Sequence, residues 1–300
     1  MHQARMLIGT SMASKESRKK YDFKTMWRTA PGAVGYYDIL GKKYPVAEMD
    51  EIIVSSNTLS KKDYRDCRIM NLFVQTFYNN SLFEEIFALL RSINVAPIDC
   101  LIYMTDHPEL YSPSIKKILK DFIFATMEDL YQSFEEAQQS VLTPETMDKY
   151  IKGELGCNEL LTNREHLFNN FNDICDLIFK SAKETIRKKN LLTKEIKNYL
   201  IELQRFILIR KKDPLIDVGS VKSATFRYDF EAISKNEYHI NPNSAPLLNT
   251  PLRFDFSFNQ EQKKYISNQI QLYTAQTEGM GRMMVQADMR FFFRSFSKSR

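Results

Sequence analysis

The chain has 300 residues, 43% of them hydrophobic and 26% charged, so it is long and apolar enough to bury the core of one large domain or two ordinary ones. Glycine is scarce, at 9 residues, and phenylalanine is abundant, at 21, which favours helices over loop-rich β architecture. The net charge of +5 is a small excess, and the basic runs lie far apart, at residues 18–20, 187–189 and 210–212. We interpret the last two runs as solvated helix ends and expect no nucleic-acid partner, because a nucleic-acid module concentrates its basic residues on one face.

The residues that usually carry metal or cofactor chemistry are scattered. The cysteines are too far apart for the CxxC or CxxxCxxC spacing of a metal or iron–sulfur loop: Cys67, Cys100, Cys157 and Cys175. HExxH, GxGxxG, P-loop and GxSxG motifs are also missing from the sequence. We therefore expect no catalytic residue and no metal site in this chain, and reduced thiols in a cytoplasmic protein. No apolar run approaches the roughly 18 residues of a membrane helix, so we expect no membrane partner.

Residues 1–57 predict strands and turns with one short helix. The polar stretch from Ser14 to Tyr21 predicts a helical turn or two, and Pro31 with Gly32 predicts a loop. Residues 46–54 predict a strand. Carboxylates occur at both parities of this strand, although a half-buried strand keeps its charged side chains on one face.

Two interpretations of these carboxylates stay open. In the first, the segment is an edge strand or a strand end, which water reaches from both sides. In the second, Glu48 or Glu51 pairs with a buried cation such as Arg28. Arg28 follows the only tryptophan, Trp27, and its own alternative is an exposed cation that stacks on an aromatic ring.

Residues 58–215 predict a helical domain. Three apolar stripes at helical spacing run over residues 115–134, 167–182 and 196–207. The acidic pairs at residues 84–85 and 135–136 are interpreted as solvated helix faces, since adjacent residues on a helix point in different directions. Helix starts are marked by capping-box pairs and by a cap residue before proline: Ser60 with Asp63, Ser81 with Glu84, Thr162 with Glu165, Ser112 before Pro113, and Thr143 before Pro144.

Residues 216–300 predict a small α+β segment. Aromatic residues alternate with charged ones over residues 226–233 and 252–258, which predicts two neighbouring antiparallel strands with one buried and one wet face. The charged faces are expected to meet, with Arg227 or Asp229 near Arg253 or Asp255. A helix is predicted from about Gln260, and residues 291–293 form a possible last strand. The whole chain is thus predicted to have an α+β fold.

A series of short motifs in the first third of the chain carries a family resemblance. Residues 6–8 form a hydrophobic run that ends in Gly9-Thr10, like the sixth strand of a radical SAM barrel; many members have proline where this chain has Ile8 and Ser11. The motifs that follow in order are Arg18-Lys19-Lys20-Tyr21, Trp27-Arg28, Pro31-Gly32, Gly35-Tyr36, Glu48-Met49-Asp50-Glu51-Ile52-Ile53-Val54, Asn57-Thr58-Leu59-Ser60 and Tyr64-Arg65. Over residues 3–95 this order resembles the region after the barrel in bacterial radical SAM proteins that carry an N-terminal cobalamin-binding domain.

The resemblance implies a function and its cofactors. Such enzymes hold an iron–sulfur cluster on a CxxxCxxC loop of a partial (β/α) barrel, and the cluster cleaves S-adenosylmethionine to a radical. Cobalamin binds to a further domain. Neither the cluster loop nor the cobalamin domain lies in these residues, so the chain would begin at the last barrel strand and require the missing N-terminal barrel as its partner. Residues 1–57 would be the barrel edge.

The resemblance also assigns residues. The backbone of Leu7, Ile8, Gly9 and Thr10 would lie near the adenine of S-adenosylmethionine, and Arg28, Glu48 and Glu51 are candidates for a substrate pocket. We thus expect a substrate-capping or accessory region of a radical SAM enzyme, catalytically incomplete as given, with an unknown substrate. The alternative is a helical protein–protein interaction or scaffold module. An upstream coding sequence with CxxxCxxC favours the first, and an intact gene start before Met1 favours the second.

Overall fold

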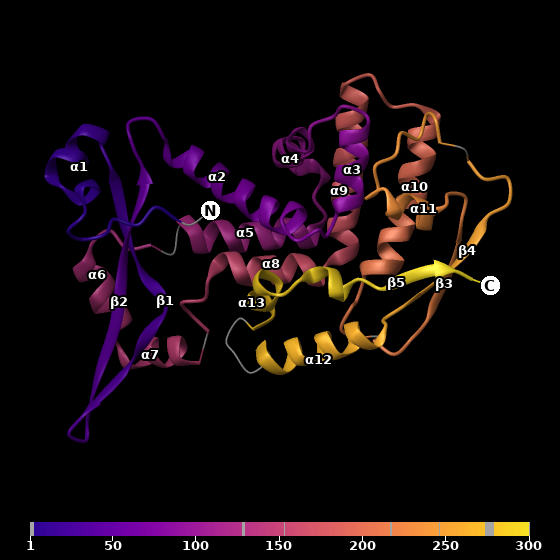
Figure 1. Ribbon diagram of the computed structural model, residues 1–300. Helices are drawn as coiled ribbons and strands as arrows, with labels where there is room; N and C mark the ends of the chain where they lie inside the picture. Colours follow the sequence, from indigo (N-terminus) through magenta and orange to yellow (C-terminus); the bar gives the residue numbers. More distant parts are fainter. Residues whose placement is uncertain are drawn as a thin grey trace. The chain divides into compact units, whose positions relative to one another are not determined.

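The computed structural model confirms the α+β fold, with helices and two small antiparallel sheets (Figure 1). It describes residues 3–127, 130–152, 154–216, 218–245, 247–273 and 279–299. The chain forms two compact units: unit 1 contains residues 1–71 and 119–163, and unit 2 contains residues 72–118 and 164–300. The units interleave along the chain, because the stretch of 58–215 predicted as one helical domain contributes to both.

Unit 1 is built on a long antiparallel hairpin of β1 (Lys24–Ile39) and β2 (Lys42–Ser55) (Figure 1). Leu40 and Gly41 both have positive φ, which suits a two-residue hairpin turn. Helices α6 and α7 pack against the hairpin. Its helices are α1 (Lys15–Tyr21), α6 (Phe134–Val141) and α7 (Pro144–Ile151), with a 3-10 helix at Ser11–Ala13.

The predicted strand over residues 46–54 is confirmed as part of β2, and the predicted helix from Ser14 is confirmed as α1, whose cap Ser14 accepts a hydrogen bond from Ser17 N–H. The predicted loop at Pro31 and Gly32 is wrong. Both residues lie within β1, where its register shifts between Thr29 and Val34. A bulge tolerates a proline without N–H and a glycine at φ 76°, so the strand continues through them.

Three helices carry the chain from one unit into the other: α2 (Lys61–Phe73), α5 (Pro113–Met127) and α8 (Glu159–Asn169). The predicted caps Ser60, Ser112 and Thr143 are confirmed, each accepting a backbone N–H three residues on. Ser81 and Thr162 are not caps. Ser81 has φ 54° rather than an extended backbone, and α8 begins three residues before Thr162, capped by Asn158.

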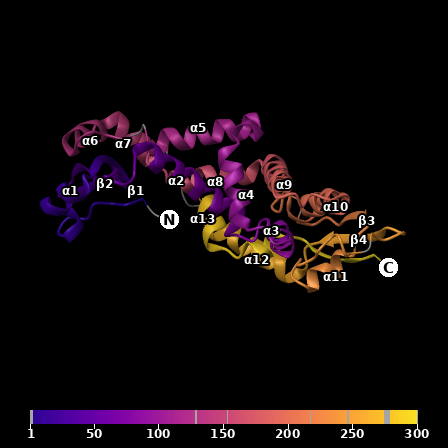
Figure 2. The ribbon, with the colours of Figure 1, turned by 90° about the horizontal axis from the view of Figure 1, so that it is seen from above.

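Unit 2 has a helical core and a three-stranded sheet. Helices α9 and α10 lie side by side (Figure 2) and bury the predicted apolar stripes. Its elements are a π-helix (Val74–Tyr78), α3 (Glu84–Ser92), α4 (Pro97–Asp106), a 3-10 helix (Pro108–Leu110), α9 (Phe171–Lys188), α10 (Lys194–Lys211), β3 (Lys222–Phe226), α11 (Phe230–Lys235), β4 (Leu252–Ser257), α12 (Gln260–Tyr273), α13 (Gly279–Gln286), a 3-10 helix (Met289–Phe292) and β5 (Ser295–Lys298).

The C-terminal strands pair as predicted, but the first is shifted. Strand β3 covers residues 222–226 rather than 226–233, and it pairs antiparallel with β4. The chain leaves the sheet because Asp229 accepts a hydrogen bond from Ala232 N–H and starts α11. The charged faces therefore do not meet: Arg253 is opposite Thr225, and Asp255 is opposite Ser223.

The third strand of this sheet lies later than predicted. Residues 289–292 form a 3-10 helix where the sequence suggested a strand, and β5 follows at residues 295–298. Among the described residues, no single helix is long and apolar enough to cross a membrane; α3 and α4 reach that length only as a pair bent by 114°.

Candidate functional site

Unit 1 contains a cavity of about 160 Å³ between β1, the loop after α7 and the first turn of α8. A cavity of about 150 Å³ accommodates a benzene-sized molecule. Aromatic and apolar side chains form part of its wall: Tyr131, Tyr150, Leu155 and Ala125. Polar residues that line it include Arg28, Thr29, Glu154, Cys157, Glu159 and Asn163.

Two arginines and one glutamate form the buried polar part of this site, which we call the charged floor: Arg28, Arg68 and Glu159. Arg28 Nη1 donates to Glu159 Oε2 at 2.9 Å, and Arg68 Nη2 donates to Glu159 Oε1 at 2.8 Å. The three side chains are only 10%, 8% and 5% exposed, in the order Arg28, Arg68 and Glu159. Two guanidinium groups share one carboxylate, so the charged floor has a net charge of +1. Both arginines have Glu159 as a partner, but the excess of one positive charge among the three buried side chains favours a ligand that brings a negative charge.

The local structure explains how these side chains are held. Asn158 caps α8, which places Glu159 at the positive N-terminal end of the helix. The Arg68 guanidinium carbon lies 5.7 Å from the centre of the Phe122 ring, a cation–π contact that helps to hold the guanidinium in place. On β1, Trp27 exchanges two backbone hydrogen bonds of 2.8 Å with Tyr131 and so holds that ring at the cavity wall.

The site has unused hydrogen-bonding capacity. Arg28 donates Nη1 to both Glu159 and Gln3, and its Nη2 and Nε have no hydrogen-bond partner within the described part of the chain. Asn163 donates Nδ2 to the Glu159 carbonyl, while its buried Oδ1 has no partner among the described residues. Thr29 and Tyr150 share a hydrogen bond of 2.9 Å at the wall. The cavity is thus lined by an arginine with donors that make no other hydrogen bond among the described residues.

The structure places one of the three substrate-pocket candidates at the cavity and the other two elsewhere. Arg28 lines the cavity and is 8% exposed, so its interpretation as an exposed cation stacked on a ring is wrong. Its carboxylate partner is Glu159 and neither Glu48 nor Glu51: Glu48 is exposed, and Glu51 binds Arg18 through bonds of 2.6 and 2.7 Å. Arg68 and Glu159 were missed because they lie 91 residues apart in sequence, and no local pattern joins them.

The segment expected beside S-adenosylmethionine lies elsewhere in unit 1. Residues 4–6 run along β2, with hydrogen bonds from Met6 N–H to Glu51 and from Ile53 N–H to Ala4. Leu7 to Thr10 then form a turn, in which the Leu7 carbonyl accepts both the N–H and the hydroxyl of Thr10. Both lone pairs of that carbonyl are used, so it has no acceptor capacity left for adenine.

The Glu51–Arg18 pair gives a pH-dependent prediction. The Arg18 guanidinium, helped by the Thr25 hydroxyl, lowers the pKa of Glu51 from its ordinary value of 4.5 and outweighs the opposing effect of burial. The pair therefore stabilises the fold above pH 4.5, and this contribution is lost as the pH falls through the lowered pKa. We expect Glu51→Gln to be less stable than wild type at pH 7 and to approach it toward pH 3 in urea unfolding. Glu48→Gln, in the same strand but exposed, is the control; an equal pH profile for both variants contradicts the assignment.

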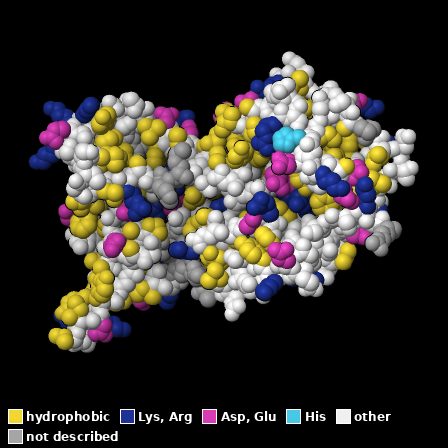
Figure 3. Space-filling view, in the orientation of Figure 1, with side chains coloured by type: hydrophobic (Ala, Val, Ile, Leu, Met, Phe, Trp, Pro, Cys, Tyr) yellow, Lys and Arg dark blue, Asp and Glu magenta, His cyan; other side chains and the backbone are white. Residues whose placement is uncertain are grey.

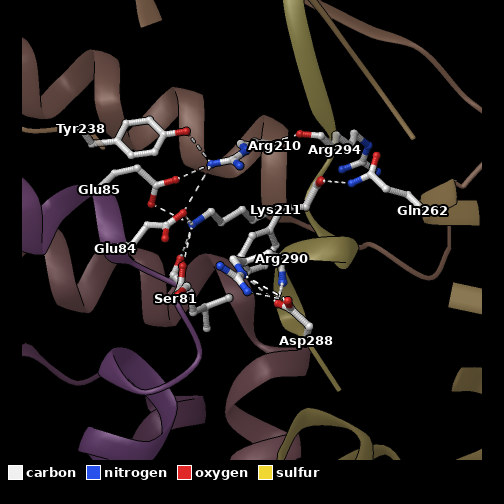
Figure 4. Close-up of polar contacts among 12 residues, drawn as sticks. Ser81, Glu84, Glu85, Arg210, Lys211, Tyr238, Gln262, Asp288, Arg290 and Arg294 are labelled. Carbon is white, nitrogen blue, oxygen red and sulfur yellow. Dashed lines mark hydrogen bonds and ion pairs between the residues drawn. The ribbon is translucent and has the colours of Figure 1, made fainter. Parts of the chain in front are cut away.

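Unit 2 holds a second buried polar cluster, which we call the lysine cluster: Glu84, Glu85, Arg210 and Lys211 (Figure 4). Lys211 and Glu85 have no exposed side-chain surface and are joined by a bond of 2.8 Å. Lys211 also donates to the carbonyls of Ser81 and Leu82, so all three of its N–H groups are used. Arg210 Nη1 lies 2.8 Å from Glu85 Oε1.

This cluster corrects two sequence-based interpretations. Neither the pair at residues 84–85 nor the run at residues 210–212 is simply solvated, because Glu85 and Lys211 are buried together. Burial lowers the pKa of Lys211, and the nearby Glu85 carboxylate opposes that shift. Two acidic side chains of α3 and two basic side chains of α10 balance one another in the lysine cluster, whereas the three buried side chains of the charged floor in unit 1 keep one excess positive charge.

The described residues of this chain do not fit an iron–sulfur cluster. Within the described ranges, no group of three or more histidine, cysteine, aspartate or glutamate side chains is placed to hold a metal ion. Cys100 and Cys175 are buried, and burial raises the pKa of Cys100 to about 12, so its thiol stays protonated at neutral pH.

Comparison with known proteins adds no assignment to this geometry. No model of a known protein family matches the chain, and no curated protein matches it.

Proposed function

We propose that this chain is the substrate-binding part of a radical SAM enzyme. Its cavity would hold one end of the substrate, while a barrel outside these 300 residues carries the iron–sulfur cluster and S-adenosylmethionine that supply a radical. The supporting observation is that Arg28, within the stretch that resembles the family, lines a cavity with an unmatched positive charge. A fixed charge of this kind orients a substrate, and orientation is what a reactive radical needs from its binding partner.

The remaining features of unit 1 fit this role. Leu7 and Ile8 are exposed, Ile8 by 97%, at the place where the resemblance puts the last barrel strand. A covering barrel would remove these apolar side chains from water. Cobalamin would bind to a domain outside this chain. The free cysteines suit a reducing cytoplasm, where we place the enzyme.

The test is to express the chain together with its upstream coding sequence, reconstitute the product anaerobically and measure 5′-deoxyadenosine. We expect the longer protein to bind about four irons per cluster and to cleave S-adenosylmethionine. The 300-residue chain alone, as the matched control, is expected to take up no cluster and to form no 5′-deoxyadenosine. A gene that begins at Met1 with its own ribosome-binding site, or a longer product without a cluster motif, would sink the proposal.

A scaffold function is the second candidate, and one observation favours it. The end of the β1–β2 hairpin exposes five apolar side chains, visible as the yellow tip at the lower left of Figure 3: Tyr36, Tyr37, Ile39, Leu40 and Tyr44. An exposed apolar patch is typical of a protein-binding surface. Under this function the chain would act without a barrel, and the expression experiment above separates the two.

A further inference from the structure

We infer that the cavity of unit 1 is an anion subsite that binds the carboxylate of a small organic acid. This inference deepens the proposed function and rests on it, since it names the group by which the substrate would be held. It is carried by the charge, the open hydrogen-bonding atoms and the size of the cavity.

The first argument is the positive charge of Arg28 at the cavity. Arg68 is held by its 2.8 Å bond to Glu159 and by its contact with Phe122, and it is not one of the residues that line the cavity. Arg28 also touches Glu159, so its positive charge is the one left over at the cavity. One negative charge on a ligand balances the charged floor. Arginine binds a carboxylate through two parallel N–H groups, and Nε and Nη2 of Arg28 are the pair left available.

The surroundings favour a single carboxylate over a phosphate. Glu154 also lines the cavity, but it is exposed, so its solvated carboxylate offsets the charge of the buried floor only in part and opposes a second negative charge there. The buried Oδ1 of Asn163, a residue of the lining, is an acceptor without a partner among the described residues, which disfavours a further anionic oxygen close to it. The volume of about 160 Å³ and the rings of Tyr131 and Tyr150 suit a benzoate-sized acid.

The first test measures ligand binding to the wild-type chain and requires no variant. The only tryptophan, Trp27, is hydrogen-bonded to Tyr131 of the cavity wall, so its fluorescence reports on ligands there. We expect benzoate to bind at least about tenfold more tightly than benzamide, its neutral analogue of the same shape, and more tightly than inorganic phosphate. Equal binding of benzoate and benzamide, no binding of benzoate, or preferred binding of phosphate overturns the inference.

Two variants of the charged floor separate an electrostatic role from a structural one, because one is expected to weaken benzoate binding and the other to strengthen it. Arg28→Gln removes the unmatched charge and should weaken benzoate binding about tenfold or more. Glu159→Gln leaves two positive charges and should strengthen it several-fold. Arg18→Gln, in unit 1 but paired with Glu51, is the matched control and should bind as wild type. Loss of binding in both floor variants that remain folded would make the floor merely structural.

If a variant of the charged floor fails to fold, the comparison of benzoate with benzamide on the wild-type chain still tests the anion subsite. The two proposals also fail separately. Benzoate binding without S-adenosylmethionine cleavage by the longer protein removes the proposed function and keeps the subsite. Cleavage without any preference for benzoate over benzamide removes the subsite and keeps the proposed function.

Discussion

Lys211→Met is expected to lower the free energy of unfolding by about 3–5 kcal/mol. The substitution keeps most of the side-chain length but removes an ammonium group that is wholly buried against Glu85. Among the described residues, Glu85 would keep Arg210 as its cationic partner, and the carbonyls of Ser81 and Leu82 would lose the hydrogen bond from Lys211. Breaking a buried ion pair on one side costs more than removing both charges, because the remaining charge cannot be solvated.

The neighbouring Lys212→Met is the control. The Lys212 side chain is 38% exposed, and its ion pair with Asp213 is long, at 3.8 Å. This substitution should change stability by less than about 1 kcal/mol. The double variant Glu85→Leu with Lys211→Met should recover part of the loss, because it leaves fewer unmatched buried charges. Urea unfolding of the four proteins measures all of these values. Equal costs for Lys211→Met and Lys212→Met would mean that the lysine cluster does not stabilise unit 2.

Phe254→Ala is expected to cost about 3–5 kcal/mol of unfolding free energy. Phe254 is fully buried in β4, with its ring centre 6.0 Å from that of Phe226 and 6.3 Å from that of Phe296. These rings hold β3, β4 and β5 to one another, so the lost side chain leaves a cavity in the middle of the sheet.

Arg253→Ala is the matched control for Phe254→Ala, because Arg253 is the preceding residue of β4 and is exposed. Its cost should be several times smaller, since an exposed side chain on a strand contributes at most about 1 kcal/mol. Thermal and urea unfolding of both variants would check the ratio. Two equal costs would show that the sheet is not held by its aromatic face.

Local sequence signals predicted helices and strands, but they did not predict which charged side chains pair in the two polar clusters. Ser112 and Thr143 marked their helices because a cap acts over three residues. Glu159 and Arg28 are 131 residues apart, and Glu85 and Lys211 are 126 residues apart, so their pairing depends on the tertiary fold. A lysine at a helix end has the same local pattern whether it is solvated or buried.

The shift of β3 has a similar cause. Phe226, Tyr228 and Phe230 alternate as in a strand, and all three are buried. Their burial was predictable from the alternation, but the backbone that achieves it was not. A single cap, Asp229, turns the chain into α11 and buries Phe230 from a helix instead. At this point, the helix cap at Asp229 therefore outweighs the alternation of aromatic residues that predicts a strand.

The most direct measurement on the cavity is a crystal structure of the 300-residue chain grown with benzoate. The benzoate carboxylate is predicted to lie within about 3 Å of Nε or Nη2 of Arg28, with its ring against Tyr131 or Tyr150. Glu159 should remain bonded to Arg68 in the same crystal. Benzoate bound elsewhere on the chain, or a cavity that holds only water at saturating benzoate, would contradict the assignment of unit 1 as the anion-binding site.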